Sequence, residues 1–363
     1  MEQGKISAGE LALLVMSFTI GSWVVLPTGI QAWQNLWLII FLGLGEGLLL
    51  IYFDLALFRR FPGKTLFEIH ELVYGPFVGK LFSLCFLWFF LQMGGGTLGI
   101  FVTLLKTTVF TATPDLALLI PWVLILVYGC RQGIEVIARS NQLLIMGTVG
   151  LVLISILLVL NIFNPENLLP FFNLSFAEML WISIGIAAFP FGQNILFLMI
   201  LPRVNRWQKV TGAVCKGMIG AGLVLSTIQF LAVGVVGKAG QILVFPTFEF
   251  YRLINIGRVL TRLELIPLLN FLTMGFVKVI LCLYALAVGT AHLFNLRTYR
   301  PLVIPLGLFL LLVAGRIYPD ISEHIRYIQK VQTFLVLFFA LLLPLVTLGV
   351  AFLRRLPRKG MTP

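Results

Sequence analysis

The segment AFPFGQN at residues 188–194 interrupts an apolar run that is otherwise long enough to form a membrane-spanning helix. Pro190 has no backbone N–H and Gly192 has no Cβ, so neither residue favours a continuous helix. A second interruption, IGSWVVLP at residues 20–27, lies in the first apolar run of the chain. Each break alone is compatible with an ordinary proline kink, which spanning helices tolerate. The two breaks together are the observation on which the fold prediction depends.

The composition of the chain around these breaks is that of a membrane protein. Of its 363 residues, 60% are hydrophobic and 11% are charged, and the mean hydropathy is +1.03. A soluble domain has about 45–50% apolar and about 25% charged residues. A single soluble core cannot bury this apolar excess. The composition therefore predicts an all-α polytopic membrane protein and excludes the disordered, collagen-like and disulfide-rich classes.

Ten apolar runs approach or exceed the length of about 20 residues that a helix needs to cross the hydrocarbon layer. Five spans in each half would give the second half the opposite orientation to the first. The breaks then occupy corresponding positions in the first and sixth spans, a pattern typical of inverted-repeat transporters. We predict a single membrane domain over residues 1–363, with repeats at about 8–163 and 176–353, and with spans at 8–32, 35–58, 78–107, 114–130, 136–163, 176–200, 209–236, 264–292, 301–317 and 331–353.

The basic residues are distributed unevenly between the two sides of this topology. The formal net charge is +12, and 17 of the 26 Lys and Arg residues fall in the segments that join the N-terminal side, against 8 on the opposite side. Cytoplasmic loops carry the excess of Lys and Arg, so we expect both termini in the cytoplasm. Because these charges gather at span ends, where they meet lipid headgroups, we interpret them as membrane-facing and exclude a nucleic-acid partner.

Two connections are long enough to carry structure of their own. Residues 59–76 place apolar side chains at helical spacing, which predicts a short interfacial helix on the cytoplasmic side. Residues 237–263 contain FPTFEFYRLINIG, a second amphipathic stretch whose aromatic side chains we expect at the level of the lipid headgroups.

The two breaks are also the predicted ligand site. An interrupted helix frees backbone N–H and C=O groups near the membrane midplane, and its dipole attracts a carboxylate while its freed carbonyls accept from an ammonium group. Such a site suits a small polar ligand, above all an amino acid. The first break contributes the candidate residues Gly21, Ser22 and Trp23, and the second contributes Phe191 and Gly192. Either aromatic ring would close over the ligand side chain.

The third and eighth spans supply the remaining candidates. The stretch QMGGGT at residues 92–97 adds Gln92 and Gly95, although close helix packing is an alternative reason for its glycines. Lys278 falls in the middle of the eighth span, where a lone charge is costly. We hypothesise that it lies near the central cavity and replaces a coupling cation. Snorkelling or a structural ion pair, with Glu46 as a candidate partner, is the alternative.

The sequence contains no recognisable pattern for enzyme chemistry. The four Cys and three His residues do not form a CxxC or a metal-ligand cluster, and dinucleotide, phosphate-loop, zinc-protease and hydrolase motifs are not found. We therefore predict a non-enzyme with no catalytic residues, no metal and no cofactor. We also expect no removable signal peptide.

Several stretches carry a resemblance to a known family. FPGKTLFE at residues 61–68, followed by GKL at 79–81, resembles an FPxKTLFE signature, and RQGIEVIAR at 131–139 is similar to a GIEVxAR loop. NLLP at 167–170 and a later segment that ends in RLE at 262–264 extend the likeness along the chain. These motifs resemble those of the B-subunit permeases of bacterial spore germinant receptors, a branch of the amino acid/polyamine/organocation superfamily.

The resemblance implies a LeuT-like 5+5 inverted repeat with broken first and sixth helices. It also implies a subunit of the spore inner membrane that binds a nutrient germinant and acts with an A-type subunit and a lipoprotein C-type subunit. A proton- or sodium-coupled amino acid transporter is the alternative, and a purely structural membrane scaffold is a third reading. Two positions depart from the family pattern: Trp23 replaces a glycine of the first break, and Gln193 replaces an acid after the second.

Overall fold

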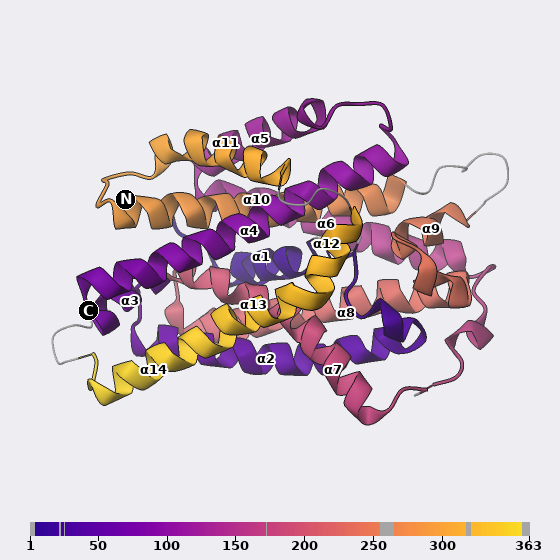
Figure 1. Cartoon of the computed structure of the whole chain (residues 1–363), viewed down its shortest axis with the longest axis horizontal. Coiled ribbons are helices and arrows are strands. Elements are labelled where there is room, and N and C mark those ends of the chain that lie inside the picture. The colour runs from indigo at the N-terminus through magenta and orange to yellow at the C-terminus, as the bar shows by residue number, and fades with distance from the viewer. Residues whose placement is uncertain are drawn as a thin grey trace.

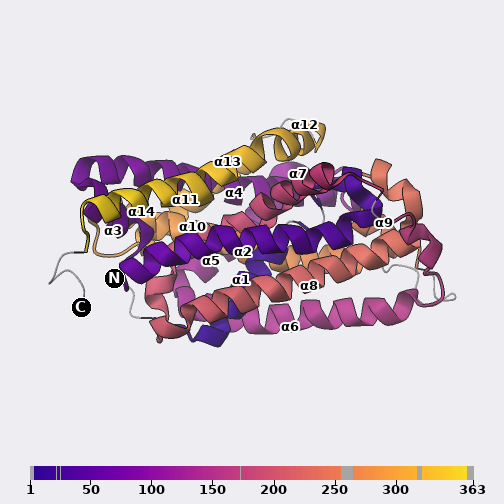
Figure 2. The same cartoon turned by 90° about the horizontal axis from the view of Figure 1, so that it is seen from below.

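The fold is described from a computed structural model at residues 4–21, 23–24, 26–171, 173–254, 265–316 and 321–357. The helices in these ranges lie side by side in one elongated bundle, and α1 (Ala8–Ile20) lies near its centre (Figures 1 and 2). The predicted all-α fold is confirmed. The α-helices of 18 residues or more in these ranges are α2 (Leu36–Arg60), α4 (Pro76–Thr108), α5 (Asp115–Gln132), α6 (Ile134–Val159), α8 (Val210–Val236) and α10 (Leu265–Leu293).

Shorter helices complete the bundle, and several of them join into one longer rod. They are α3 (Leu66–Tyr74), α7 (Phe176–Ile186), α9 (Pro246–Arg252), α11 (Val303–Ala314), α12 (Ile321–Tyr327), α13 (Thr333–Leu337) and α14 (Leu343–Leu353). The last three are linked by the single π-helical turns η9 (Ile328–Gln332) and η10 (Phe338–Leu342), and together they cross the bundle as a continuous helix (Figure 1).

The protein is an integral membrane protein. In the described part of the chain, eight helices are long and apolar enough to cross a bilayer: Ile30–Arg60, Pro76–Thr108, Asp115–Gln132, Ile134–Val159, Phe176–Met199, Trp207–Ile242, Leu265–Leu293 and Ser322–Leu353. Two shorter apolar helices, Ala8–Ile20 and Arg300–Ala314, occupy the places of the predicted first and ninth spans. The count of ten crossings therefore stays a prediction.

Two span boundaries differ from those expected. The first span is helical only to Ile20, because the chain leaves the helix at the predicted break. The last span begins near residue 322 instead of 331. Several of its first ten residues have polar side chains, and these lower the mean hydropathy on which the predicted boundary relied. These residues nevertheless belong to the same rod as the rest of the span.

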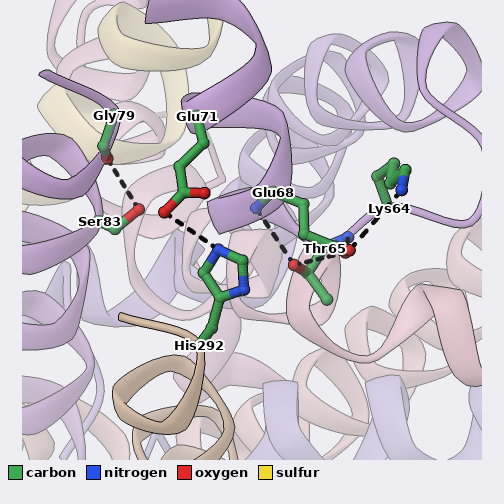
Figure 3. Close-up of polar contacts among 7 residues, drawn as sticks. All are labelled: Lys64, Thr65, Glu68, Glu71, Gly79, Ser83 and His292. Atoms are coloured by element: carbon green, nitrogen blue, oxygen red, sulfur yellow. Dashed lines mark hydrogen bonds and ion pairs between the residues drawn. The ribbon is translucent and has the colours of Figure 1, made fainter. Parts of the chain in front are cut away.

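The amphipathic helix expected within residues 59–76 is confirmed as α3, and Figure 3 shows how the FPxKTLFE signature starts it. The Thr65 hydroxyl accepts from the backbone N–H of Glu68 at 3.3 Å, and the Glu68 carboxylate accepts from the backbone N–H of Thr65 at 2.7 Å. This reciprocal capping box satisfies two N–H groups that have no partner within the helix. The signature is therefore, in part, a helix start signal.

Side-chain contacts fasten α3 to the ends of two long helices. The Glu71 carboxylate lies 3.4 Å from Nε2 of His292 at the end of α10 (Figure 3), and the Arg354 guanidinium at the end of α14 donates to the Val73 carbonyl. Burial lowers the pKa of His70, on the inner face of α3, to about 3, so this imidazole is neutral near pH 7. Thus α3 is a fixed part of the bundle and not only a surface helix.

The aromatic side chains of α9, in the connection expected at the headgroup level, are buried inside the protein. Within α9, Phe250 and Tyr251 are buried, and the Tyr251 hydroxyl lies 2.7 Å from the hydroxyl of Ser155 on α6. These rings pack inside the protein, where α9 lies against α8 and reaches α6, and do not form an exposed face. Their expected place at the level of the headgroups stays a prediction. Residues 255–264, which include the RLE motif, lie outside the described residues.

The two ends of the described chain lie at the same end of the bundle as α3 (Figures 1 and 2). Near the start of the chain, the Ile6 N–H donates to the Arg203 carbonyl at 2.9 Å. Near its end, the Leu356 carbonyl accepts from Nε of Arg60 at 2.6 Å. An even number of crossings produces this arrangement, and the cytoplasmic location of this end stays a prediction.

Candidate functional site

The first break occurs where the sequence predicts it. Helix α1 ends at Ile20, and Gly21 follows with φ +22° and ψ −118°, a backbone conformation that L side chains rarely adopt. The described residues that follow, 23–24 and 26–29, form no regular helix, and a short 3-10 helix, η1 (Ile30–Asn35), then leads into α2. Trp23 is buried on this non-helical path. Ser22, another candidate ligand residue, lies outside the described residues.

The second break is confirmed within AFPFGQN. After α7, the chain passes through one π-helical turn, η3 (Ala187–Phe191), in which Phe189 is extended with φ −127° and ψ 109°. It then continues as a 3-10 helix, η4 (Gly192–Met199). The extended Phe189 turns its carbonyl out of the helix, and the next residue is a proline without a donor. The break therefore presents a freed carbonyl, as the sequence argument expected.

Buried hydrogen bonds join the two breaks. The Trp23 indole Nε1 donates to the Thr28 hydroxyl at 3.0 Å, and that hydroxyl donates to the Phe189 carbonyl at 3.1 Å. A second link runs through Asn194, whose amide donates to the Thr19 hydroxyl at 2.9 Å and to the Phe191 carbonyl at 2.8 Å. Neither Thr28 nor Asn194 was among the predicted site residues. Because the links satisfy carbonyls freed by the second break, they make the breaks one structural unit.

We expect Thr28→Val to destabilise this unit. Valine has nearly the shape of threonine but no hydroxyl, so the indole N–H and the Phe189 carbonyl lose the partner that they share. The expected loss is about 1–3 kcal/mol of unfolding free energy, since buried polar groups without partners are costly and hydrogen bonds in membranes are individually weak. Thermal unfolding in detergent measures it. Thr28→Ser keeps the hydroxyl and is the control; equal losses in both variants would contradict the role of the relay.

Lys278 contacts both breaks from α10. Its side chain is fully buried, and its Nζ lies 4.8 Å from the ring centroid of Phe189 and 5.4 Å from that of Phe18 in α1. A Cβ on Gly21 would lie 2.8 Å from Cδ of Lys278, so the glycine also makes room for the lysine stem. A cation over aromatic faces is attracted by their negative potential. The hypothesis that Lys278 stands near the centre therefore agrees with its location.

A cavity with about 400 Å³ of empty space, part of which is continuous with the surroundings, opens beside Lys278. Three of its walls come from α4, from the second break and from α10, and the fourth comes from the rod that begins with α12. Its lining combines amide, hydroxyl, imidazole and ammonium groups with aromatic rings. The lining residues are Phe89, Gln92, Met93, Gly96, Thr97, Ile100, Phe189, Gln193, Lys278, His324, Tyr327, Ile328, Gln332, Leu335 and Val336.

Of the predicted site residues, Gln92 and Lys278 line this cavity. Gly95 does not: a Cβ there would lie 2.5 Å from Val313 on α11, so close helix packing, the alternative reading, accounts for this glycine. Phe191 instead packs on α2, where a Cβ on Gly47 would lie 2.5 Å from the Phe191 Cβ.

Gly192 and Trp23 support the cavity without lining it. A Cβ on Gly192 would lie 2.9 Å from Val336, which does line the cavity, so this glycine permits the close approach of α13. The Trp23 indole is held by Thr28 and is 2% exposed, so the bulky ring at this position fills the space between the breaks. Trp23 is therefore not among the residues that line the cavity.

The sequence argument missed Gln193 and the residues of the last rod. Gln193 directly follows the break, and its Oε1 is buried without a hydrogen bond in the described structure. Its position after PFG was the available signal. His324 and Tyr327 precede the predicted last span, which begins at residue 331, so no span-based argument could place them beside the breaks. Gln332 falls at the very start of that span.

Two carboxyl groups on α2 lie outside the cavity. Glu46 accepts from the Ser183 hydroxyl of α7 at 2.7 Å, and its pairing with Lys278 is not found among the described residues. Asp54 is 1% exposed, and neither of its carboxyl oxygens has a hydrogen-bond partner in the described structure. The described part of the chain contains no group of three or more His, Cys, Asp or Glu side chains placed to hold a metal ion.

Comparisons with known proteins show which family this chain resembles. A family model described as "Spore germination protein" matches residues 5–320. Spore germination protein KB of Bacillus subtilis (strain 168) is 29% identical over 371 residues, which cover 99% of this chain and 98% of that protein. Spore germination protein YndE of the same organism is 22% identical over 364 residues, which cover 97% of each chain.

A solved structure with a similar fold is that of Mhp1, a nucleobase-cation-symport-1 family transporter, in a closed conformation with bromovinylhydantoin bound. The TM-score is 0.62 at 16% identity, and the match covers 97% of this chain and 79% of that one. This likeness shows the fold, a transporter-like arrangement of the LeuT type with broken first and sixth helices. Because the family model spans most of the sequence, the chain belongs to the spore germination protein family, as its signature motifs indicated.

Proposed function

We propose that this protein is the nutrient-sensing B-subunit of a spore germinant receptor and that it binds a small polar germinant, an amino acid above all, in the cavity beside the two breaks. The observation that carries the proposal is that Lys278 and Gln193 line the same cavity. The lysine offers a cation for a carboxylate, and the buried Gln193 oxygen is an acceptor for an ammonium group. The rings of Phe89 and Phe189 supply apolar walls.

The bonds between the breaks suggest how binding becomes a signal. A ligand that contacts Lys278 or Gln193 touches a unit in which both breaks are tied together by Thr28 and Asn194. A ligand shifts a conformational equilibrium only by the difference in its affinity for the two states. Contacts with groups whose positions depend on the breaks provide such a difference. The protein is then a sensor without catalytic chemistry of its own.

The proposal includes partners and location. A B-subunit of this family would act in the spore inner membrane with an A-type subunit and a lipoprotein C-type subunit, with both termini in the cytoplasm. The fold is consistent with one membrane domain over residues 1–363 that contains two repeats at about 8–163 and 176–353. Purification of the complex from spores, followed by protease protection of the termini, tests these assignments.

A second candidate function is cation-coupled amino acid transport, favoured by the likeness to the fold of a solved transporter. The cavity would be the same, and only net flux would differ. Concentrative uptake of a labelled amino acid into proteoliposomes that contain this chain alone would support transport. Ligand binding without uptake would support the sensor.

A thermal-shift screen of the purified protein with amino acids, sugars and nucleosides tests the proposed site. We expect an amino acid to raise the melting temperature, because a ligand at about 100 times its Kd stabilises the bound state by about 2.7 kcal/mol. Gln193→Leu should remove the shift, since it deletes the acceptor in the cavity. Gln229→Leu is the matched control, because Gln229 is a buried glutamine on α8 away from the cavity lining. A shift that survives Gln193→Leu would place the ligand elsewhere.

A further inference from the structure

Two helices on one side of the bundle form a groove that the proposed function does not use. Helices α5 and α11 lie next to each other along one edge (Figure 1). They approach closely because Gly307 faces α5: a Cβ there would lie 2.5 Å from Val127 and 3.5 Å from Val123. The Tyr299 hydroxyl, just before α11, also donates to the Cys130 carbonyl of α5 at 3.4 Å. This contact fixes the ends of the two helices together.

The outer faces of both helices carry exposed apolar stripes at four-residue spacing, which places each stripe on one helix face. On α11 the stripe is Ile304, Leu308 and Leu312, which are 46–57% exposed. On α5 it is Leu116, Ile120, Leu124 and Tyr128, which are 47–69% exposed. The α5 stripe spans 12 residues, or about 18 Å at 1.5 Å per residue. That length is close to half of the hydrocarbon layer, about 15 Å.

The groove ends in a cationic pocket. About 810 Å³ of open space is lined by Leu124, Val127, Tyr128, Arg131, Gln132 and Arg300. Arg131 comes from the end of α5, and Arg300 comes from the short turn that starts α11. In the described residues, neither guanidinium group donates a side-chain hydrogen bond or forms an ion pair, unlike Arg139 nearby, which pairs with Glu135 at 2.5 Å.

We propose that this groove binds an anionic phospholipid, with its phosphodiester between Arg131 and Arg300 and an acyl chain along the apolar stripes. Guanidinium groups match phosphate oxygens in charge and in geometry, and they hydrogen-bond two oxygens at once. The Tyr128 ring suits the boundary between headgroup and hydrocarbon. Here a pocket with two arginines is continuous with apolar stripes about half a bilayer long. This combination distinguishes the site from scattered basic residues at helix ends.

Native mass spectrometry of the full chain in detergent, with added dioleoylphosphatidylglycerol or dioleoylphosphatidylcholine, tests the proposal. We expect phosphatidylglycerol to bind at least about tenfold more tightly than phosphatidylcholine, and the Arg131→Gln/Arg300→Gln variant to lose this preference. Arg316→Gln is the control, since Arg316 is exposed beyond the opposite end of α11. Equal binding of the two lipids, or the same loss in the control, would overturn the assignment.

Two further arms separate a lipid from a free phosphate ion and from a folding defect. Inorganic phosphate at millimolar concentration should neither displace the lipid nor raise the melting temperature, because it cannot use the apolar stripes. Displacement by phosphate would assign the pocket to a free anion and reject the lipid. The double variant should melt within about 2 °C of the wild type in lipid-free detergent, because both side chains are exposed. A much lower melting temperature would show that the two arginines stabilise the fold itself, which would contradict a role confined to lipid binding.

Discussion

Replacing Lys278 with methionine is expected to abolish the ligand-induced rise in melting temperature while the protein still folds. Methionine keeps an unbranched chain of similar length against Gly21 and Phe189, but it removes the cation from the cavity wall. Loss of one partner from a buried, hydrogen-bonded charge contact costs about 2–5 kcal/mol, or roughly 30-fold or more in Kd. A ligand supplied at its wild-type saturating concentration would then occupy little of the variant. Intrinsic tryptophan fluorescence during heating gives both the melting temperature and the shift.

The matched control for this change is Cys282→Ser. Cys282 lies one turn further along α10, is fully buried and does not line the cavity, so this nearly isosteric change tests perturbation of the helix alone. We expect the ligand shift to persist in Cys282→Ser. An unchanged shift in Lys278→Met would remove the lysine from the ligand site and return it to the structural role that its sequence position also allowed.

Gly21→Ala is expected to reduce the unfolding free energy by about 2–5 kcal/mol. This loss is the sum of two costs. The backbone at residue 21 has φ +22°, a conformation that costs alanine about 1–2 kcal/mol. The new methyl group also overlaps neighbouring atoms, at a further cost of about 1–3 kcal/mol. The added Cβ would lie 2.7 Å from the Phe18 carbonyl oxygen and 2.8 Å from Cδ of Lys278. In a background in which the exposed Cys85 and the half-buried Cys215 are replaced by serine, a thiol-reactive dye reports unfolding, because Cys130 and Cys282 are buried in the folded protein.

Gly63→Ala separates the two costs. Gly63 also has a positive φ, +77°, but nothing lies within 4 Å of an added Cβ, so only the backbone strain applies. We expect this variant to lose about 1–2 kcal/mol. The difference between the variants then measures the overlap at the first break. If both lose the same amount, the close approach of Lys278 to Gly21 is not a constraint on the fold.

The breaks were predictable because proline and glycine act locally. Pro190 removes a donor, and Gly21 allows a backbone conformation closed to other residues, whatever surrounds them. The start of α3 also has a local signal, since Thr65 and Glu68 form their capping box within four residues of sequence, although the prediction of this helix rested on the spacing of its apolar side chains. These features needed no knowledge of the tertiary packing.

The walls of the cavity were less predictable because they depend on which helix faces meet. Gln92 and Gly95 are three residues apart in one apolar helix, yet one lines the cavity and the other packs on α11. Hydropathy does not distinguish such faces when a helix is buried on nearly all sides. The contribution of His324 required the last rod to cross beside the second break, a long-range contact that leaves no periodic signal in the sequence.

The contact between Glu71 and His292 joins the end of α10 to α3. Lys278 and His292 are 14 residues apart on one uninterrupted helix, a separation of about 21 Å. A tilt of about 5° pivoting at Lys278 would therefore move the His292 end sideways by about 2 Å. Because the Glu71 carboxylate lies 3.4 Å from His292, such a tilt would alter the contact with α3, so α10 connects the buried cavity to the end of the bundle where α3 lies.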